Sequence, residues 1–339
     1  MINFKMIVTN KNIKRRIKSI LQYRIRRVDG LDYLKYNKNA PSINPLNKKE
    51  KVLHSVFLHV PSGTLYDKKL GILSRSKIGK SQIKRCGLIG EKKPSLNKVT
   101  KIKKGTSFYC NSASGGFYHW LVECIPRYYF IDKSVQCYLP KLNNLNREIL
   151  NTIYDETHNI NEVDDEWLFF EEFITARYFA LPGRGFLPLE FRKHILKIVP
   201  NNIYNDKVVF ISRSNAPKRK LLNEAELINK VLSKHSALIV HLENYKFLEQ
   251  LKIINNSRIV IATHGAGLSN IIAAPKNCKI LEILSTNVKP MNFYKDLSTS
   301  IGLNYSSYLI RQPVGRNDDF NFTEEDLNFI DAFISDNKL

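Results

Sequence analysis

With 339 residues the chain is long enough for two domains. Its composition is that of a globular protein, because 43% of the residues are hydrophobic and 25% are charged. No stretch of 18 or more apolar residues occurs, so the sequence predicts no membrane-spanning helix, and its start lacks the apolar run and cleavage site of a secretory signal. The formal net charge of +22 is concentrated in one third of the chain, because residues 1–104 contain 27 Lys and Arg against 5 Asp and Glu, whereas residues 105–339 contain 26 of each.

The basic excess allows two interpretations. It could form a surface for anionic lipid or an anionic glycan. It could also reflect a compositional bias, because the chain is rich in Asn and Ile as well as Lys. A nucleic-acid-binding protein is a rival hypothesis that the charge suggests. Against it, the excess is confined to the N-terminal third and no nucleic-acid-binding motif occurs, so we expect no nucleic acid partner.

Five widely spaced cysteines occur and none forms a C-x-x-C pair. This pattern indicates reduced thiols in a reducing compartment, and neither a disulfide framework nor a zinc site. We therefore expect a cytoplasmic protein.

The basic N-terminal region, residues 1–104, is interpreted as part of an N-terminal domain. Residues 11–28, KNIKRRIKSILQYRIRRV, have apolar side chains at helical spacing and basic side chains largely on the other faces, which predicts a basic amphipathic helix. The helix could lie on an anionic membrane surface, or it could dock on its own domain with its charged side in solvent. Residues 37–50 read as a loop, and VLHSVFLHV, GTLYD and KRCGLIG read as short strands and turns.

Residues 105–204 are predicted as the acceptor-side part of that domain. They begin with the motif S-A-S-G-G-F-Y-H-W-L-V-E-C-I-P-R, in which Ser112 or Ser114 could cap a helix. Pro126 would clash inside a helix, so we expect a kink or a new helix there. REILNTIYDE reads as a helix, EWLFFEEFI as a strand and LPGRGFLP as a turn-rich segment.

Residues 205–339 are predicted as a C-terminal domain with a regular pattern. The strand-like segments are KVVFISRS, ALIVHLE, RIVIATH and KILEIL, and the helical ones are NEAELINKVLSKH, KFLEQLKIINN, LSNIIAA and NFYKDLSTSIG. Such alternation predicts βαβ units with a parallel sheet. The last segment, FTEEDLNFIDAFISD, predicts a helix capped by Thr323, which could pack back on the N-terminal domain.

The strongest local signal is a strand followed directly by a glycine-containing turn and then a helix. The turn consists of His264, Gly265, Ala266, Gly267 and Leu268. Ligands of open parallel sheets bind beyond the carboxyl ends of the strands, and a helix N-terminus there favours phosphate. His264 could donate a hydrogen bond to a phosphate oxygen. Alone, however, this turn could equally be structural.

A second loop carries arginine at the end of the preceding strand, KVVFISRSNAPKR. Arg213 and Arg219 are suited to bidentate phosphate binding, and Asn223 and Glu224 then begin the next helix. Two loops, one rich in glycine and one in arginine, are expected to converge on one anionic group. The alternative is a solvated basic loop.

In the third motif, His119 and Glu123 are four residues apart and therefore share one helical face. Such a pair can serve as a general base with an orienting partner. Alone, the spacing is also common for a surface pair or a satisfied core pair.

In this order the three motifs resemble glycosyltransferase family 61, which includes bacterial capsular-polysaccharide transferases, plant xylan-decorating enzymes and animal protein O-GlcNAc transferases. The resemblance covers residues 110–285 and is clearest in FYHWLVECIPR, SRSNAPKRKLLNEAEL and EQLKIINNSRIVIATHGAGLSNIIAAPKNCKILEIL. Residues 1–104 carry no motif of the family. Animal and plant members tend to carry Asp where this chain has Glu123.

The resemblance implies an α/β fold of the GT-B type, with two facing Rossmann-like domains and a cleft between them. It also implies a nucleotide-sugar donor, most plausibly a UDP-sugar, inversion at the anomeric carbon, and no metal cofactor. The sequence agrees with the last point, because Asp164-Asp165-Glu166 precedes an apolar run instead of following a strand.

The resulting hypothesis assigns a role to each candidate residue. Arg213, Arg219 and the turn from His264 to Leu268 would hold the diphosphate, with Asn223 beside them, and Glu282 could accept hydrogen bonds from ribose hydroxyls or be structural. Glu123 or His119, from the opposite domain, would deprotonate the acceptor. The acceptor would be a glycan or a lipid-linked glycan in capsule or surface polysaccharide synthesis, reached at the inner face of the membrane through residues 11–28. The rival of the same fold is a catalytically inactive sugar-nucleotide or glycan-binding module.

Overall fold

The computed structural model describes residues 51–67, 99–110, 116–176, 185–199, 207–285, 292–310, 313–314 and 317–337. All of them lie in one compact unit, Glu50–Leu339. The predicted helix over residues 11–28, the loop over 37–50, the KRCGLIG segment and the two serines proposed as helix caps lie outside the described residues. The predicted boundaries at residues 104/105 and 204/205 stay predictions.

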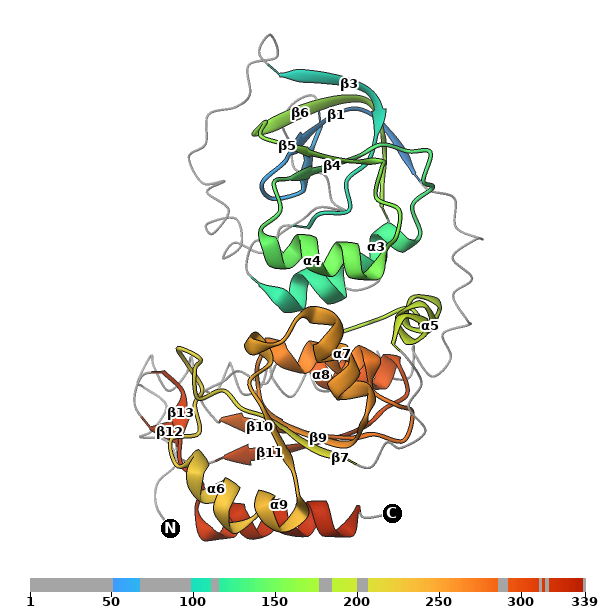
Figure 1. Ribbon diagram of the computed structural model, residues 1–339. Coiled ribbons are helices and arrows are strands. Elements are labelled where there is room, and N and C mark those ends of the chain that lie inside the picture. Colours follow the sequence, from blue (N-terminus) through green and yellow to red (C-terminus); the bar gives the residue numbers. More distant parts are fainter. Residues whose placement is uncertain are drawn as a thin grey trace, which may run out of the picture. The chain divides into compact units, whose positions relative to one another are not determined.

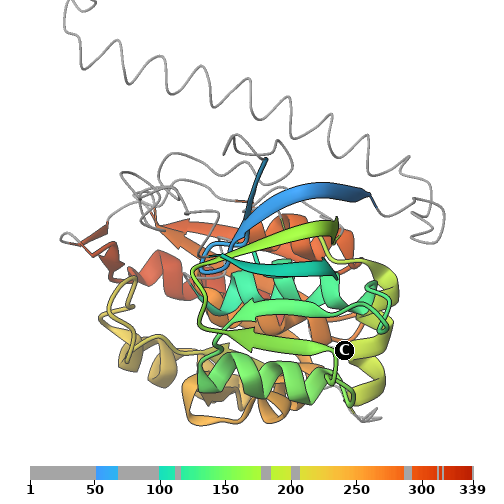
Figure 2. The same cartoon turned by 90° about the horizontal axis from the view of Figure 1, so that it is seen from above.

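The first half of this unit contains a four-stranded mixed sheet of order β2-β1-β6-β3 (Figures 1 and 2). Its strands are β1 (Val52–His59), β2 (Thr64–Tyr66), β3 (Thr100–Gly105) and β6 (Trp167–Ile174). Strand β1 pairs antiparallel with both β2 and β6, and only β3 runs parallel to β6. A separate parallel pair joins β4 (Cys137–Pro140) to β5 (Ile160–Val163).

This sheet differs from the parallel sheet that a Rossmann-like N-terminal domain would contain. The short turn between β1 and β2 is the local cause, because a tight connection can join only antiparallel strands. Gly63 in that turn has φ +65°, and a Cβ atom there would lie 2.4 Å from the carbonyl oxygen of Tyr109. The strands predicted from VLHSVFLHV, GTLYD and EWLFFEEFI are confirmed.

The helices of the first half include one of an unusual type. A π-helix, η5, spans His119–Cys124 and continues into α3 (Ile125–Tyr129), so the helix predicted to restart near Pro126 is confirmed. The predicted helix in REILNTIYDE is α4 (Asn144–Ile153), in which Asn143 caps the first turn. Helix α5 (Leu189–Ile198) follows later in the chain.

The second half contains a five-stranded sheet whose neighbouring strands are all parallel, in the order β11-β10-β9-β7-β8. Its strands are β7 (Lys207–Ile211), β8 (Leu238–Val240), β9 (Ser257–Thr263), β10 (Lys279–Ser285) and β11 (Asn304–Ile310). The predicted parallel sheet is confirmed, although β11 was not predicted. Numbered along the chain, the order is 2-1-3-4-5, which places the topological switch point between β7 and β9.

Helices cover both faces of this sheet (Figure 1). One face packs against α7 (Phe247–Asn255) and α8 (Phe293–Ser300), and the other against α6 (Glu224–Lys230) and α9 (Glu324–Asp336). Alternate residues of β7 serve the two faces, with Val209 and Ile211 on the first and Val208 and Phe210 on the second. The remaining short elements are the 3-10 helices η6 (Leu232–His235), η7 (Leu242–Asn244) and η8 (Ala266–Ala273) and the strands β12 (Pro313–Val314) and β13 (Asp319–Phe320).

The last helix, α9, packs on the second half of the unit. Thr323 caps it as predicted, in a capping box with Asp326. Among the described residues its apolar side chains join the cluster of the C-terminal sheet, and Asp331 bonds to His235 at 2.6 Å. The leucine and isoleucine side chains of α9 pack on a face of the second-half sheet. The sequence pattern predicted the helix but could not identify which sheet it would cover.

The two halves share contacts within the compact unit. One cluster of buried apolar side chains contains residues of α4 and η5 as well as residues of β7, β9, α7 and α8. The Glu148 carboxylate accepts a hydrogen bond from the backbone N–H of Phe247 at 2.7 Å. Arg192 of α5 donates to the carbonyl oxygens of Ile301 and, at 2.8 Å, Ala274. The GT-B arrangement of two facing domains stays a prediction.

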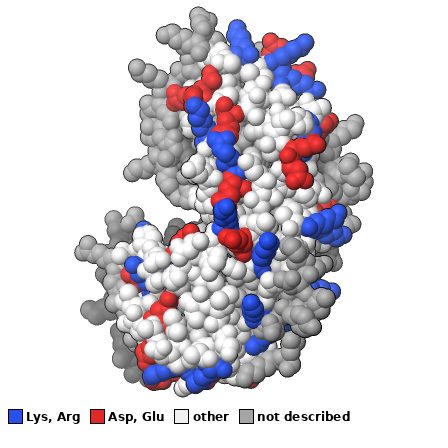
Figure 3. Space-filling model, viewed as in Figure 1, with Lys and Arg blue, Asp and Glu red and all other residues white. Residues whose placement is uncertain are grey.

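Basic and acidic side chains are interspersed on the face shown in Figure 3, without a large region of one sign. This agrees with the balanced charge of residues 105–339. None of the helices in the described ranges is both long and apolar enough to cross a membrane. The four described cysteines, Cys110, Cys124, Cys137 and Cys278, are buried and form no disulfide.

Candidate functional site

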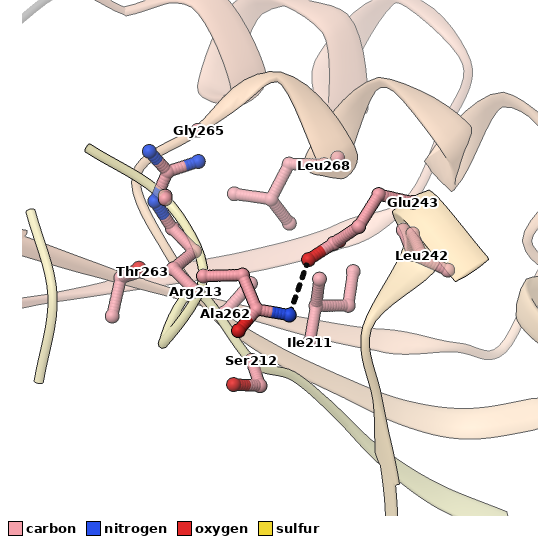
Figure 4. Close-up of a pocket in the computed structure, with 12 residues that line it drawn as sticks. Ile211, Ser212, Arg213, Leu242, Glu243, Ala262, Thr263, Gly265 and Leu268 are labelled. Atoms are coloured by element: carbon pink, nitrogen blue, oxygen red, sulfur yellow. Dashed lines mark hydrogen bonds between the residues drawn. The ribbon is translucent and has the colours of Figure 1, made fainter. Parts of the chain in front are cut away.

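A pocket of about 310 Å³ lies beyond the carboxyl ends of β7, β8 and β9, at the switch point of the parallel sheet. Its lining is Ile211, Ser212, Arg213, Asn215, Ala216, Leu242, Glu243, Ala262, Thr263, Gly265, Gly267 and Leu268. Two of the three predicted motifs, the arginine loop and the glycine turn, therefore meet in one pocket. The close-up in Figure 4 shows Leu268 and Leu242 on opposite sides of it and Arg213 beside Gly265.

The contact between Arg213 and Gly265 explains why this turn needs glycine. The backbone of Gly265 is extended, with φ 179°, so any residue could adopt its conformation. A Cβ atom there, however, would lie 2.0 Å from Nη1 of Arg213. The guanidinium group thus lies directly against the turn, and its Nη2 donates to the carbonyl oxygen of Lys218 at 3.1 Å.

The two arginines of this loop are close to each other and short of hydrogen-bond acceptors. Burial, and then the neighbouring charge of Arg219, lower the pKa of Arg213 from its usual value. The Nε atoms of Arg213 and Arg219 are both buried, and neither has a hydrogen-bond partner among the described residues. The two arginines are half-buried and carry like charges, and a diphosphate would supply acceptors for both. Arg219 has φ 59°, a left-handed conformation.

His264 lies next to the two arginines, and the Glu282 carboxylate forms a hydrogen bond with its ring. Its Nδ1 bonds to Oε1 of Glu282, whose Oε2 accepts from the hydroxyl of Tyr305 at 2.5 Å. His264 is 5% and Glu282 1% exposed. Because both oxygens of Glu282 are buried and bonded within the protein, the geometry favours the structural alternative for Glu282, in which it orients His264, over binding of a ribose. The other ring nitrogen, Nε2, is left for a ligand.

Asn223 also differs from the expectation. Its side-chain nitrogen donates to Glu226 at 2.8 Å and to the carbonyl of Phe322 at 3.0 Å, and its oxygen accepts from the backbone N–H of Phe322 at 2.9 Å. The side chain is thus committed to joining α6 to the segment before α9. We assign Asn223 a structural role instead of donor binding.

The glycine turn continues into a helix of a different type from the one expected. Ala266–Ala273 is the 3-10 helix η8, and the N–H of Leu268 bonds to the carbonyl of Gly265 at 3.1 Å. The first N–H groups of a helix lack acceptors within it, whichever type it is. Gly267 lines the same pocket as Leu242. A Cβ atom at position 267 would lie only 3.2 Å from the Leu242 side chain, so glycine avoids a tight contact there.

The third motif lies on the π-helix. Nδ1 of His119 is 3.0 Å from Oε2 of Glu123, close enough for an ion pair, although the angle is poor for a hydrogen bond. The side chains are 25% and 10% exposed, so both keep some access to solvent. Short π-helical segments within helical structure are rare in proteins overall, but many of those that occur are found at functional sites. Arg127, also in the motif, is structural: it donates to the carbonyl oxygen of Phe108 at 2.7 Å.

Aromatic residues at the start of α8 connect the motifs, and sequence reasoning missed them. The ring of Phe293 is 6.4 Å from that of His119 and 6.2 Å from that of His264. The ring of Tyr294 is 5.4 Å from that of His264. Their position beyond the carboxyl end of β10 was the available signal, because ligands bind at that edge of a parallel sheet.

The described residues contain no group of three or more His, Cys, Asp or Glu that could hold a metal ion. The predicted independence from metal is not tested by this geometry. What the site offers is positive charge from guanidinium groups on one side and a carboxylate with a histidine on the other.

Comparison with known proteins agrees with this geometry. Residues 117–281 match the model of the family named glycosyltransferase 61. The chain is 35% identical over 113 residues to the chicken EGF domain-specific O-linked N-acetylglucosamine transferase, a stretch that covers 32% of this chain and 20% of that protein. It is 31% identical over 100 residues to the protein O-linked-mannose beta-1,4-N-acetylglucosaminyltransferase 2 of Xenopus tropicalis, covering 28% and 17%.

The fruit fly EGF domain-specific transferase is similar to the same degree, with 33% identity over 104 residues, 30% of this chain and 19% of that protein. The chain thus spans about a fifth of the length of the curated relatives that it matches.

Proposed function

We propose that this protein, whose residues 117–281 match the model of glycosyltransferase family 61, transfers a sugar from a nucleotide-sugar donor to a hydroxyl group of a glycan acceptor. The observation that carries the proposal is the pair of half-buried arginines on the loop at the switch point. Arg213 lines the pocket, and the Nε atoms of Arg213 and Arg219 have no hydrogen-bond partner among the described residues. A diphosphate bound there would satisfy both groups and offset their mutual repulsion. The same charges would stabilise the nucleoside diphosphate as it leaves.

The proposed arrangement follows the edge of the sheet. The nucleoside would occupy the pocket between Leu242 and Leu268, whose volume is in the range of ligand sites. The diphosphate would lie on Arg213, Arg219 and the first N–H groups of η8. His264, oriented by Glu282, would reach a phosphate oxygen through Nε2.

For the chemical step we propose a single displacement with inversion at the anomeric carbon. Glu123 would take the proton from the acceptor hydroxyl as that oxygen attacks, and the bond from the sugar to the diphosphate would break. His119, with its Nδ1 3.0 Å from the Glu123 carboxylate, would orient Glu123 or serve as the base itself. The guanidinium groups would supply the positive charge that a metal ion supplies in other transferases.

The finer assignments rest on the family resemblance. A UDP-sugar is the proposed donor, and the names of the relatives make N-acetylglucosamine the first sugar to test. We propose a glycan or lipid-linked glycan of the capsule or cell surface as acceptor, and a location at the cytoplasmic face of a membrane.

Hydrolysis of nucleotide-sugars without acceptor is the first test. We expect slow release of UDP from one UDP-sugar, measured against GDP- and CDP-sugars. A wild-type protein that binds none of them would contradict the proposal, and one that binds a nucleotide-sugar but transfers and hydrolyses none would favour an inactive binding module of the same fold.

Replacing Arg213 tests the site itself. Arg213→Ala should weaken UDP binding by roughly 10- to 100-fold, because a hydrogen bond to a charged group contributes about 1.5–3 kcal/mol. Calorimetry measures the loss, and Arg213→Lys is the matched control that keeps the charge but not the planar fork. Equal affinity of Arg213→Ala and wild type would show that Arg213 does not bind phosphate.

A further inference from the structure

Three aromatic residues, Tyr118, Phe293 and Tyr294, form one cluster between the two halves of the proposed site. The ring of Tyr118 is 5.0 Å from that of Phe293 and 5.6 Å from that of Tyr294. Phe293 also faces the rings of His119 and His264, at 6.4 and 6.2 Å, the second in a stacked orientation of 27°. One half-buried side chain therefore contacts a histidine of each motif.

The hydroxyl of Tyr118 is buried without a partner. The residue is 6% exposed, and its hydroxyl makes no hydrogen bond to any of the described residues. Native proteins keep few such groups, because a buried hydroxyl that has lost water and gained no partner is destabilising. Burial raises the pKa of Tyr118 well above its usual value, and the charge of Glu123 and the nearby Tyr294 and Asp296 raise it further. The hydroxyl thus stays protonated and is a hydrogen-bond donor at every pH of interest.

The ring contacts of Phe293 connect the cluster to both motifs, because its ring lies near His119, next to the proposed base, and near His264, next to the proposed diphosphate site. The charges of Glu123 act on Tyr118, and those of Glu282, Arg219 and Arg213 act on Tyr294. In a single displacement the sugar must lie between the attacking hydroxyl, near the base, and the leaving diphosphate. The aromatic cluster therefore lies near the residues proposed for both ends of the reaction.

We propose that Phe293 and Tyr118 form the subsite for the transferred pyranose ring, with the half-buried ring of Phe293 against the apolar C–H face of the sugar and the Tyr118 hydroxyl donating a hydrogen bond to a sugar hydroxyl. The inference rests on the proposed function and adds to it the residues that distinguish sugars. An aromatic face suits a pyranose because one side of the ring presents C–H groups, whose contacts with a π-system are favourable.

The test separates the nucleotide from the sugar. Calorimetry is run with UDP and with UDP-N-acetylglucosamine, or with the pair that the hydrolysis screen selects in their place. Phe293→Leu should weaken binding of the nucleotide-sugar by roughly 2- to 10-fold, the size of an aromatic contact. Binding of the nucleoside diphosphate should not change, because the diphosphate site lies on other residues. Phe293→Tyr keeps the ring and should bind both ligands like the wild type.

Tyr118→Phe removes only the hydroxyl. It should weaken nucleotide-sugar binding by roughly 2- to 10-fold, the size of a neutral hydrogen bond, and leave the melting temperature of the free protein unchanged or raised. Tyr128→Phe is the matched control. Its hydroxyl donates to Asn159 at 2.5 Å and contacts the carbonyl of Glu156 at 3.2 Å, so its loss should lower the melting temperature.

The possible results distinguish failure of the proposed function from failure of the sugar subsite. If wild type binds neither ligand, the proposed function fails. If it binds both and Phe293→Leu and Tyr118→Phe change the two affinities equally or not at all, the donor site stands and the sugar subsite is wrong. A melting temperature of Tyr118→Phe that falls as far as that of Tyr128→Phe would show that the hydroxyl has a structural partner, which also overturns the subsite.

Discussion

At the scale of single residues, the site is a set of polar groups whose partners in the protein are incomplete. Arg213 and Arg219 are half-buried and close enough for the charge of Arg219 to lower the pKa of Arg213, and their buried Nε atoms have no hydrogen-bond partner among the described residues. Glu282, by contrast, is fully bonded and holds His264 in one orientation. This difference distinguishes the residues proposed to bind the ligand, Arg213 and Arg219, from Glu282, which positions another side chain.

Glu123→Gln tests the base. The substitution keeps the size of the side chain but removes the proton acceptor, so kcat should fall by roughly 100-fold or more, the usual contribution of a general base. UDP affinity should stay close to that of the wild type, because the diphosphate is held on the other side of the site. Initial rates with the donor selected by screening, together with calorimetry, measure both quantities.

His119→Ala serves as the companion variant. If Glu123→Gln turns over at a near wild-type rate while His119→Ala is inactive, the two residues exchange roles. Two active, folded variants would make the whole motif structural.

At the scale of elements, the site depends on where strands of the parallel sheet end. Strands β7 and β9 are neighbours in the sheet although β8 lies between them in the chain. The loops that follow them therefore leave the same edge at the switch point and bring Arg213 against Gly265. The π-helix that carries His119 and Glu123 is the corresponding irregular element of the first half.

Gly265→Ala tests this meeting of two loops. The added methyl group would lie 2.0 Å from Nη1 of Arg213, and the flexible arginine side chain is what must move. We expect weaker UDP binding with little change in melting temperature, measured by calorimetry and thermal denaturation.

The double variant is the control. If displacement of Arg213 is the cause, Gly265→Ala in an Arg213→Ala background should cost no further affinity. A further loss of the same size would show that the methyl group acts on the turn itself.

At the scale of the whole molecule, basic charge is distributed unevenly. The N-terminal third holds the entire excess, whereas the remainder is balanced, and the face shown in Figure 3 carries interspersed charges of both signs. The positive charge of the proposed site is therefore local, supplied by two arginines and a helix terminus and not by a general basic surface.

Chelation tests that local charge. We predict that transfer or donor hydrolysis survives EDTA, because the guanidinium groups can offset the charge on the leaving diphosphate without a divalent cation. Rates with and without chelator are compared. Loss of turnover that Mn²⁺ or Mg²⁺ restores would contradict this prediction.

Membrane association tests the predicted helix over residues 11–28. Four or more basic residues on an amphipathic helix favour an anionic bilayer, so the full chain should sediment with liposomes that contain anionic lipid. A variant lacking this segment should sediment less, and high salt should reduce the difference. Equal partitioning of the two proteins would return the segment to a structural role.

The sequence by itself determined the parallel sheet of the second half, most of its strands and helices, the cap at Thr323 and the two loops that meet in the pocket. These features are encoded locally: apolar runs of strand length alternate with helical periods, and glycine and arginine follow strand ends. The motifs also predicted the resemblance to glycosyltransferase family 61, because three of them occur in the family's order, and residues 117–281 match the family's model. The residues of the two loops could therefore be placed at one edge before their contacts were known.

Only the tertiary structure decided the rest. The mixed sheet of the first half depends on which strands pair, and strand pairing joins residues far apart in the chain, such as Val52 and Ile174. Glu282 and Asn223 carry polar side chains at the ends of elements, as ligand-binding residues do, and only their hydrogen bonds within the protein favour a structural role for them. Phe293 reads as an ordinary apolar residue of a helix. Its place between His119 and His264 arises from the folding of three distant segments onto one another, which no local pattern records.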